Sequence, residues 1–168
     1  MNVLLLSDTH DHIDELMLQY AAEADEVWHA GDVGTIKVLE TLEKVKPIRA
    51  VYGNIDGRDV RGVCPLDLRF TAEGVEVLMT HIGGYPGNYE PRVRKLIQAA
   101  PPQLFICGHS HILKVMRDPT TGTLCMNPGA AGVHGFHKMR TMIRFQLSAG
   151  RILQPEVIEL GLRGKLLK

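Results

Sequence analysis

The run Val3–Leu6 is apolar throughout and then breaks into Ser-Asp-Thr-His, which places a carboxylate and an imidazole two residues apart at Asp8 and His10. A short run without polar alternation is typical of a strand covered on both faces, as in the middle of an α/β layer. In extended backbone, residues i and i+2 point the same way, so both side chains can reach one ion beyond the end of the strand. We therefore predict a buried strand that delivers metal ligands.

The same pattern recurs twice in the residues that follow. Residues 26–30, Glu-Val-Trp-His-Ala, predict a second buried strand, and Gly31 allows a close turn to Asp32. A third run, over 47–52, leads to Asn54. Each of these strands is thus expected to end in an oxygen or nitrogen donor.

Helical spacing of apolar residues separates these strands. Residues 13–22 are expected to form an amphipathic helix with Asp11 as its N-cap. Residues 35–45 are expected to form a second helix, which Pro47 ends. Strands that alternate with helices indicate an α/β fold, whose sites lie at the carboxyl ends of the strands.

The second half of the chain is richer in strand patterns. Strands are expected over residues 66–70, 75–81, 103–107, 113–117, 124–127, 141–147 and 152–160, with one helix over 91–100. One of these strands ends on His81, and another leads to His109 and His111. The stretch 83–89 is too rich in Gly and Pro for regular structure, so it predicts a loop beside His81 that could form the wall of a substrate pocket.

Seven donors from five segments follow apolar strands: Asp8, His10, Asp32, Asn54, His81, His109 and His111. Imidazole and carboxylate donors together favour first-row ions such as Mn, Fe or Zn over Ca or Mg. Seven donors exceed the needs of one tetrahedral zinc, so two ions are indicated. The alternative for Asp8 and Asp32 is helix capping, the commoner role of Asp at such turns; the accompanying histidines favour ligands.

The bulk properties limit the classes of protein. A length of 168 residues with 45% hydrophobic content suits a single domain over residues 1–168. Lys+Arg 19 balance Asp+Glu 19, which weighs against a long nucleic acid as partner. Three cysteines without C-x-x-C spacing fit a reducing compartment. The sequence shows no signal-peptide pattern or membrane span, so we expect a cytoplasmic protein without a membrane partner.

Five ordered motifs carry a resemblance to a known family: Asp8-x-His10, Gly31-Asp32, Gly53-Asn54, His81 and Gly108-His109-x-His111. They resemble the calcineurin-like metallophosphoesterase superfamily, in particular its small prokaryotic phosphodiesterase branch, whose closing motif is similar to residues 127–130. The resemblance covers about the whole chain. It implies a four-layer αββα sandwich of two mixed β-sheets flanked by helices, in the α/β (α+β) class.

The resemblance also implies the chemistry. One ion would take Asp8, His10 and His111, the other would take Asn54, His81 and His109, and Asp32 would bridge them. Mn is the favoured ion, with Fe, Zn or Ni as alternatives. The implied enzyme is a dinuclear phosphoesterase, most simply a phosphodiesterase, in which a metal-bridging hydroxide attacks phosphorus and Asp32 and Asn54 act through that hydroxide. Its partner would be a small phosphate ester or phosphodiester, and a homo-oligomer is an open alternative to a monomer.

Two positions depart from the family pattern. The superfamily commonly has histidine after the Asn of its Gly-Asn motif, where it contacts the phosphate or protonates the leaving group, but this chain has Ile55. Isoleucine cannot donate a proton, and a missing general acid costs on the order of a hundredfold or more in rate. Cleavage of unactivated esters is therefore expected to be slow. The second departure is Ile82, which replaces the usual continuation of the motif at His81.

Substrate contacts are predicted at five positions: Asp56, Tyr85, Asn88, Tyr89 and His134. Asp56 has two other interpretations, a hydrogen bond to a ligand residue or an Asx-turn with Gly57. A surface loop is an equal alternative for His134 and for His137. His29, inside an apolar run, is expected to be a core residue or to support a ligand.

The rival interpretation is a non-catalytic, protein-binding scaffold on the same fold. The retromer subunit that resembles this family is a protein of that kind. The isoleucine at position 55 favours it slightly. The complete set of seven donors opposes it, because polar groups clustered without ions are costly to bury.

Overall fold

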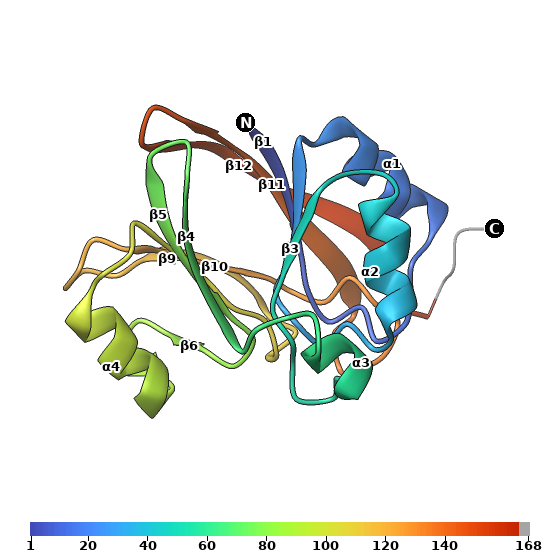
Figure 1. The fold of residues 1–168 in the computed structure, drawn as a ribbon, viewed down its shortest axis with the longest axis horizontal. Coiled ribbons are helices and arrows are strands. Elements are labelled where there is room, and N and C mark those ends of the chain that lie inside the picture. Colours follow the sequence, from blue (N-terminus) through green and yellow to red (C-terminus); the bar gives the residue numbers. More distant parts are fainter. Residues whose placement is uncertain (165–168) are drawn as a thin grey trace.

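The computed structural model describes residues 1–164 and shows two five-stranded sheets packed face to face, with helices on both outer sides (Figure 1). This confirms the predicted four-layer αββα sandwich. The last four residues of the predicted domain, 165–168, lie outside the described residues. Among the helices that the structure describes, none is long and apolar enough to cross a membrane.

The first sheet has the strand order β12-β11-β1-β2-β3. Its strands are β1 (Asn2–Leu6), β2 (Glu26–His29), β3 (Ile48–Ala50), β11 (Met139–Ser148) and β12 (Arg151–Leu162). β1, β2 and β3 are parallel, whereas β11 is antiparallel to both of its neighbours. β1 therefore lies in the middle of its sheet, as its unbroken apolar run predicted.

The second sheet has the order β4-β5-β8-β10-β9. Its strands are β4 (Asp67–Ala72), β5 (Val75–Thr80), β8 (Leu104–Ile106), β9 (Leu113–Arg117) and β10 (Leu124–Pro128). β5, β8 and β10 are parallel to one another, and β4 and β9 are antiparallel edge strands. Each sheet thus contains three parallel strands whose carboxyl ends lie at one edge.

Side chains of β1 alternate between two cores. Val3 and Leu5 point into the core between the sheets, together with Trp28, whereas Leu4 and Leu6 point to the core under the helices. The ring of Trp28 packs edge-on against Phe70 of the second sheet at 4.9 Å between centroids. Burial on both faces explains why β1 tolerates no polar residue.

Within residues 1–164, three helices cover the first sheet and one covers the second (Figure 1). They are α1 (Glu15–Glu23), α2 (Ile36–Glu43) and α3 (Arg58–Arg61) on the first sheet, and α4 (Pro91–Ala99) on the second. The prediction of Asp11 as N-cap of α1 is wrong: Asp14 has the extended backbone of a cap and accepts the N–H of Met17 at 3.0 Å. α3 was not predicted, because one helical turn is too short for a periodic pattern.

The stretch 83–89 is not an irregular loop throughout. Two short antiparallel strands, β6 (Gly84–Tyr85) and β7 (Asn88–Tyr89), form a hairpin around Pro86 and Gly87. The Gly and Pro content indicated the turn, but it could not predict that the residues on its two sides pair with each other as short strands.

Candidate metal centre

The predicted ligands follow the carboxyl ends of parallel strands in both sheets. Asp8 and His10 follow β1, Asp32 follows β2, and Asn54 follows β3 in the first sheet; His81 follows β5, and His109 and His111 follow β8 in the second. The structure thus brings segments from both sheets to one place, as strand-end sites in α/β folds require.

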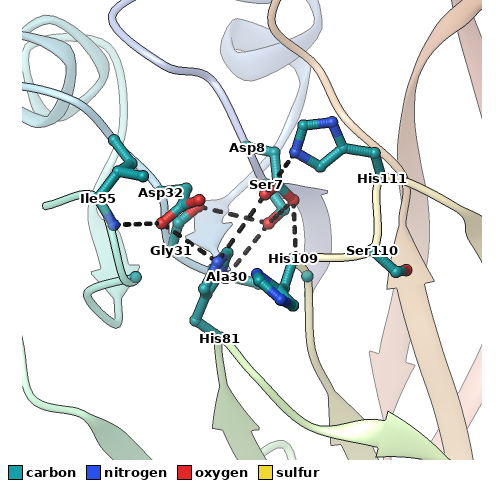
Figure 2. A network of polar contacts seen from close by, with 12 residues as sticks. Ser7, Asp8, Ala30, Gly31, Asp32, Ile55, His81, His109, Ser110 and His111 are labelled. Carbon is teal, nitrogen blue, oxygen red and sulfur yellow. Dashed lines mark hydrogen bonds and ion pairs between the residues drawn. The ribbon is translucent and has the colours of Figure 1, made fainter. Parts of the chain in front are cut away.

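Two buried carboxylates form the middle of this cluster (Figure 2). Oδ1 of Asp8 lies 3.2 Å from Nε2 of His111 and 3.9 Å from Nε2 of His81. Oδ1 of Asp32 lies 3.2 Å from the same nitrogen of His81, and its Oδ2 lies 3.7 Å from Nε2 of His10. Two groups of ligand atoms result, each within 4.8 Å: Asp8 with His10 and His111, and Asp32 with His81 and His109.

Left-handed backbone, not extended strand, presents most of these side chains. The φ angle is positive at Asp8 (55°), His10 (45°), Asp32 (52°), His109 (67°) and His111 (57°). The argument from i and i+2 in extended backbone is therefore wrong, although both side chains do reach the cluster. Such φ values in non-glycine residues cost on the order of 1–3 kcal/mol and concentrate at functional sites.

Hydrogen bonds between neighbouring loops hold this conformation. The N–H of His10 donates to the carbonyl of Asp32 at 3.1 Å, and that of Asp11 donates to Val33 at 3.0 Å. Gly53 is required for close approach, because a Cβ there would overlap Oδ1 of Asp32. Gly31 has a φ of 90°, which supports the predicted close turn.

Hydrogen bonds behind His81 and Asp8 turn their free atoms toward the centre. Nδ1 of His81 lies 2.8 Å from the carbonyl oxygen of Ala30, so Nδ1 carries the proton and Nε2 presents a lone pair. Oδ2 of Asp8 accepts the hydroxyl of Ser7 at 2.6 Å and the N–H of His109 at 3.1 Å. Oδ1 of Asp8 is left to face the histidines (Figure 2).

Three of the converging atoms are buried without a hydrogen-bond partner among the described residues: Asp8 Oδ1, His10 Nε2 and His81 Nε2. An unpaired buried polar group costs roughly 1–3 kcal/mol, and more when it is charged. Lone pairs that face one another across a buried centre repel, and a cation or a proton between them relieves this repulsion. The residues therefore fit divalent metal ions, with a donor set of imidazole and carboxylate.

The pKa values of two histidines in the cluster are shifted in opposite directions. Burial lowers the pKa of His81, but the contact of its Nε2 with the Asp32 carboxylate at 3.2 Å and the charge of Asp8 outweigh burial, so the pKa is raised. The pKa of His10 is lowered, because burial outweighs the two carboxylates. A metal ion would have to displace the proton that His81 tends to hold.

His29 supports the centre from behind and belongs to the core, as predicted. Its Nδ1 accepts the N–H of Gly31 at 3.2 Å, so its Nε2 carries the proton and donates to the hydroxyl of Thr9 at 2.9 Å. Thr9 in turn donates to the carbonyl of Val33 at 2.9 Å. This network connects the loop after β1 with the loop after β2.

A cavity of about 510 Å³ opens above the cluster. Its wall includes the predicted ligand Asn54, which is exposed, and Ile55, whose N–H donates to Oδ1 of Asp32 at 3.1 Å. His134 also lines this cavity, with its ring centroid 5.2 Å from that of His10. The size falls in the range of small-molecule sites.

Two of the predicted substrate contacts have other roles. Asp56 is buried, and its oxygens accept the N–H groups of Gly34 at 2.8 Å and Gly53 at 2.6 Å, so it fixes the loops around Asp32. Tyr89 is buried as well, and its hydroxyl donates to Asp118 at 2.8 Å. Asp56 lines neither cavity at the cluster, whereas Tyr89 forms part of the wall of the neighbouring one.

Tyr85 and Asn88, the other two predictions from the hairpin, lie in a neighbouring cavity of about 360 Å³. His109 and Ser110 line both cavities, so the two spaces adjoin. Tyr85 also receives the ammonium group of Lys114 over its ring at 3.6 Å.

Sequence reasoning missed two supporting residues. His137 lies against His111, with 3.2 Å between their Nδ1 atoms. Asn127 donates from Nδ2 to the carbonyl of Gly108 at 2.8 Å, and so holds the segment that carries His109. The Asn-Pro-Gly-Ala motif was a signal for Asn127, whereas nothing in the sequence distinguished His137 from a loop histidine.

A strand-end cluster of histidines and aspartates on a four-layer sandwich defines the class of metal-binding phosphoesterases. Residues 1–150 match the family model described as the calcineurin-like phosphoesterase superfamily domain. The chain therefore belongs to the calcineurin-like phosphoesterase superfamily, as the five motifs predicted.

Relatives with assigned names agree with this family. The probable metallophosphoesterase YsnB of Bacillus subtilis is 33% identical over 138 residues, which are 77% of this chain and 75% of the relative. A probable metallophosphoesterase of Methanothermobacter thermautotrophicus is 27% identical over 140 residues, covering 79% of this chain and 78% of the relative. Phosphodiesterase MJ0936 of Methanocaldococcus jannaschii is 25% identical over 145 residues, covering 77% and 83%.

Solved structures share the fold at low identity. Vps29 of Entamoeba histolytica, crystallised as a complex with Zn, superposes with a TM-score of 0.73 at 14% identity, over 95% of this chain and 99% of that one. A structure described as a novel archaeal phosphodiesterase gives a TM-score of 0.71 at 20% identity, over 94% of this chain and 100% of the other.

Proposed function

We propose that this protein is a phosphodiesterase that works with two divalent metal ions. The observation that carries this proposal is the convergence of unpartnered lone pairs from Asp8, His10 and His81 on a buried centre beneath an open cavity. Bound ions would lower the pKa of a water molecule and stabilise charge on the phosphoryl oxygens.

The residues of the chain would share this work in two sets. Asp8, His10 and His111 would hold one ion; Asn54, His81 and His109 would hold the other; and Asp32 would bridge them. The distances from both oxygens of Asp32, to His81 and to His10, support the bridging role. Asn54 would complete the second set from the cavity wall. We propose Mn as the ion, with Fe, Zn or Ni as alternatives.

A diester is the proposed substrate class because two adjoining cavities meet at the cluster. One would receive each arm of the phosphodiester, with Tyr85 and Asn88 contacting the arm in the smaller cavity and His134 contacting the other. The names of two similar proteins, MJ0936 and the archaeal phosphodiesterase, point to the same class.

We further propose that residues 1–168 form one domain and that the protein is cytoplasmic. The cysteines support a reducing compartment, because within residues 1–164 all three are buried and unpaired.

The test is hydrolysis by metal-stripped protein with Mn, Ni, Zn or Mg added back singly. Bis(p-nitrophenyl) phosphate and p-nitrophenyl phosphate share a leaving group, so their comparison isolates the preference for a diester. We expect cleavage only with added ion, and faster cleavage of the diester. Absence of cleavage by protein shown to hold two ions per chain would refute the proposal.

A non-catalytic scaffold is the second candidate. Ile55 favours it, because a proton donor is missing at a position that faces the cavity, and Vps29 shares the fold. The buried lone pairs oppose it, since a scaffold has no need to maintain them. Retained metal binding without hydrolysis of any ester would favour this candidate.

A further inference from the structure

An isoleucine directly follows three of the proposed ligands, and all three isoleucines are exposed. Ile55 follows Asn54 and is 47% exposed, Ile82 follows His81 and is 38% exposed, and Ile112 follows His111 and is 61% exposed. Single exposed apolar residues are ordinary, but a group gathered around one site indicates a binding surface.

A fourth apolar residue completes this group. Phe136 is fully exposed and lines the 510 Å³ cavity together with Ile55 and Ile112. Ile82 lines the adjoining cavity, which it shares with Ile112. We call these four residues the apolar collar: Ile55, Ile82, Ile112 and Phe136. Three residues of the collar thus line the same cavity as several of the proposed ligands, and Ile82 lines the cavity next to it.

The loop that carries Phe136 contacts two of the proposed ligands, one on each side of Phe136. The His134 ring lies 5.2 Å from that of His10, and His137 contacts His111. Between them Gly135 has a φ of 123°, and a Cβ there would overlap Nδ1 of His111. The backbone of Phe136 is therefore held beside the cavity by the contacts of its neighbours with two of the proposed ligands.

Ile55 is fixed in a comparable way, because its N–H donates to Oδ1 of Asp32. The N–H of Ile112 donates to the hydroxyl of Ser110 at 3.3 Å. Local hydrogen bonds thus position these apolar side chains next to the atoms that would hold the phosphoryl group. Their exposure to water is unfavourable unless a ligand covers them.

We propose that the apolar collar binds an aromatic arm of the phosphodiester, an inference that rests on the function proposed above. The phosphoryl group occupies the base of the cavity, where the donors converge, and the arm extends along Ile55, Ile112 and Phe136. A planar ring presents apolar faces to the isoleucines and an edge or face to Phe136. A concave site of this volume is suited to a small ligand, and it is less suited to the flat surface of a partner protein.

Binding to protein with added Mn tests the proposal without turnover. Diphenyl phosphate and dimethyl phosphate carry the same charge and differ only in their arms. We expect diphenyl phosphate to bind about tenfold more tightly or better, as expected for burial of an aromatic group. Phe136→Ala should reduce this preference about fivefold, Phe136→Leu should reduce it less, and Val63→Ala, at an exposed residue that lines neither cavity, should leave it unchanged.

Kinetics give a second readout with one leaving group. Bis(p-nitrophenyl) phosphate and methyl p-nitrophenyl phosphate both release p-nitrophenol, but only the first carries a second aromatic arm, so Phe136→Ala should raise KM about fivefold for the first and by less for the second. Equal binding of both phosphates, or equal losses on both substrates, would overturn the aromatic-arm proposal while the phosphodiesterase remains. Binding without any hydrolysis would refute the proposed function and leave the collar. Failure of both phosphates to bind would refute the collar as well.

Discussion

Nδ1 of His111 and Nδ1 of His137 lie 3.2 Å apart, and Nε2 of His137 lies 3.0 Å from the carbonyl oxygen of Gly132. A carbonyl only accepts, so neutral His137 carries its proton on Nε2 and its Nδ1 is an acceptor. Nδ1 of His111 must then donate, which leaves the lone pair of its Nε2 directed at Asp8. His137 thus selects the tautomer in which His111 can bind a metal.

Removal of this partner should weaken metal binding. We expect His137→Ala to raise the Kd for Mn about ten- to hundredfold, the usual effect of losing a group that orients a ligand. His137→Gln keeps an acceptor oxygen and should lose less. Isothermal titration with Mn measures both, and His12→Gln is the control, because His12 contacts Asp14 outside the cluster. Wild-type affinity in His137→Ala would show that the contact does not select the tautomer.

The bridging carboxylate should be indispensable. Asp32→Asn preserves the shape of the side chain but removes the charge that holds two cations together, so we expect loss of activity and a fall in bound metal from two ions per chain. Metal content by elemental analysis and hydrolysis of bis(p-nitrophenyl) phosphate are the measurements. Asp59→Asn, at an exposed carboxylate outside the cluster, is the matched control. Full activity in Asp32→Asn would contradict the two-metal assignment.

The order of the elements and the gathering of the predicted donors at one place were predictable because they depend on local patterns. The apolar run of β1 and the helical spacing of α1 and α2 reflect burial, which periodicity records directly. Asp32 and His81 could be assigned because each follows such a run. Parallel strands then place their carboxyl ends together, whatever the details of the loops.

The loop conformations were not predictable, because contacts distant in sequence decide them. Asp11 and Asp14 are equally good caps by residue type, but Asp11 is bound through its N–H to Val33 and takes a left-handed backbone. Tyr89 is in a Gly-rich segment, yet Asp118, far along the chain, accepts its hydroxyl in the core. The role of His137 likewise depends on His111, which the sequence places 26 residues away.

Gly53 should resist even the smallest substitution. In Gly53→Ala the new methyl group would overlap Asp32 Oδ1, so the loop after β3 must shift. We expect a loss of roughly 1–3 kcal/mol in the free energy of unfolding, as for other overpacked sites, together with weaker metal binding. Urea denaturation measures the first effect. Gly164→Ala, where a Cβ would meet open space, is the control, and equal stability of the two variants would contradict the close packing.

The buried His29 should make the protein sensitive to acid. Burial is the main cause that lowers its pKa from its usual 6.5 to about 4. Between these values the unfolded chain binds a proton that the folded chain does not, so stability is full above pH 6.5 and falls as the pH drops toward 4. The shift corresponds to roughly 3 kcal/mol.

Urea denaturation of metal-free protein between pH 7 and pH 4 tests this linkage. His29→Gln should be less stable at pH 7 but should lose less stability on acidification, because about one fewer proton is taken up on unfolding. Val63→Ala, at an exposed residue without a titratable group, should follow the wild-type slope. An identical slope in wild type and His29→Gln would mean that His29 does not titrate in this interval.

Ile55 should limit the range of leaving groups. Its side chain faces the cavity but cannot protonate a departing alkoxide, so diesters with poor leaving groups should react slowly. Ile55→His places an imidazole next to Asn54, and we expect kcat for a dialkyl phosphate to rise by at least about tenfold, with little change for p-nitrophenyl esters, whose leaving group needs no proton. The same variant should bind diphenyl phosphate more weakly, because it removes part of the apolar collar. Ile55→Asn, which is polar but supplies no acid, separates the two effects: a rise in kcat in that variant as well would show that proton donation is not what limits the reaction.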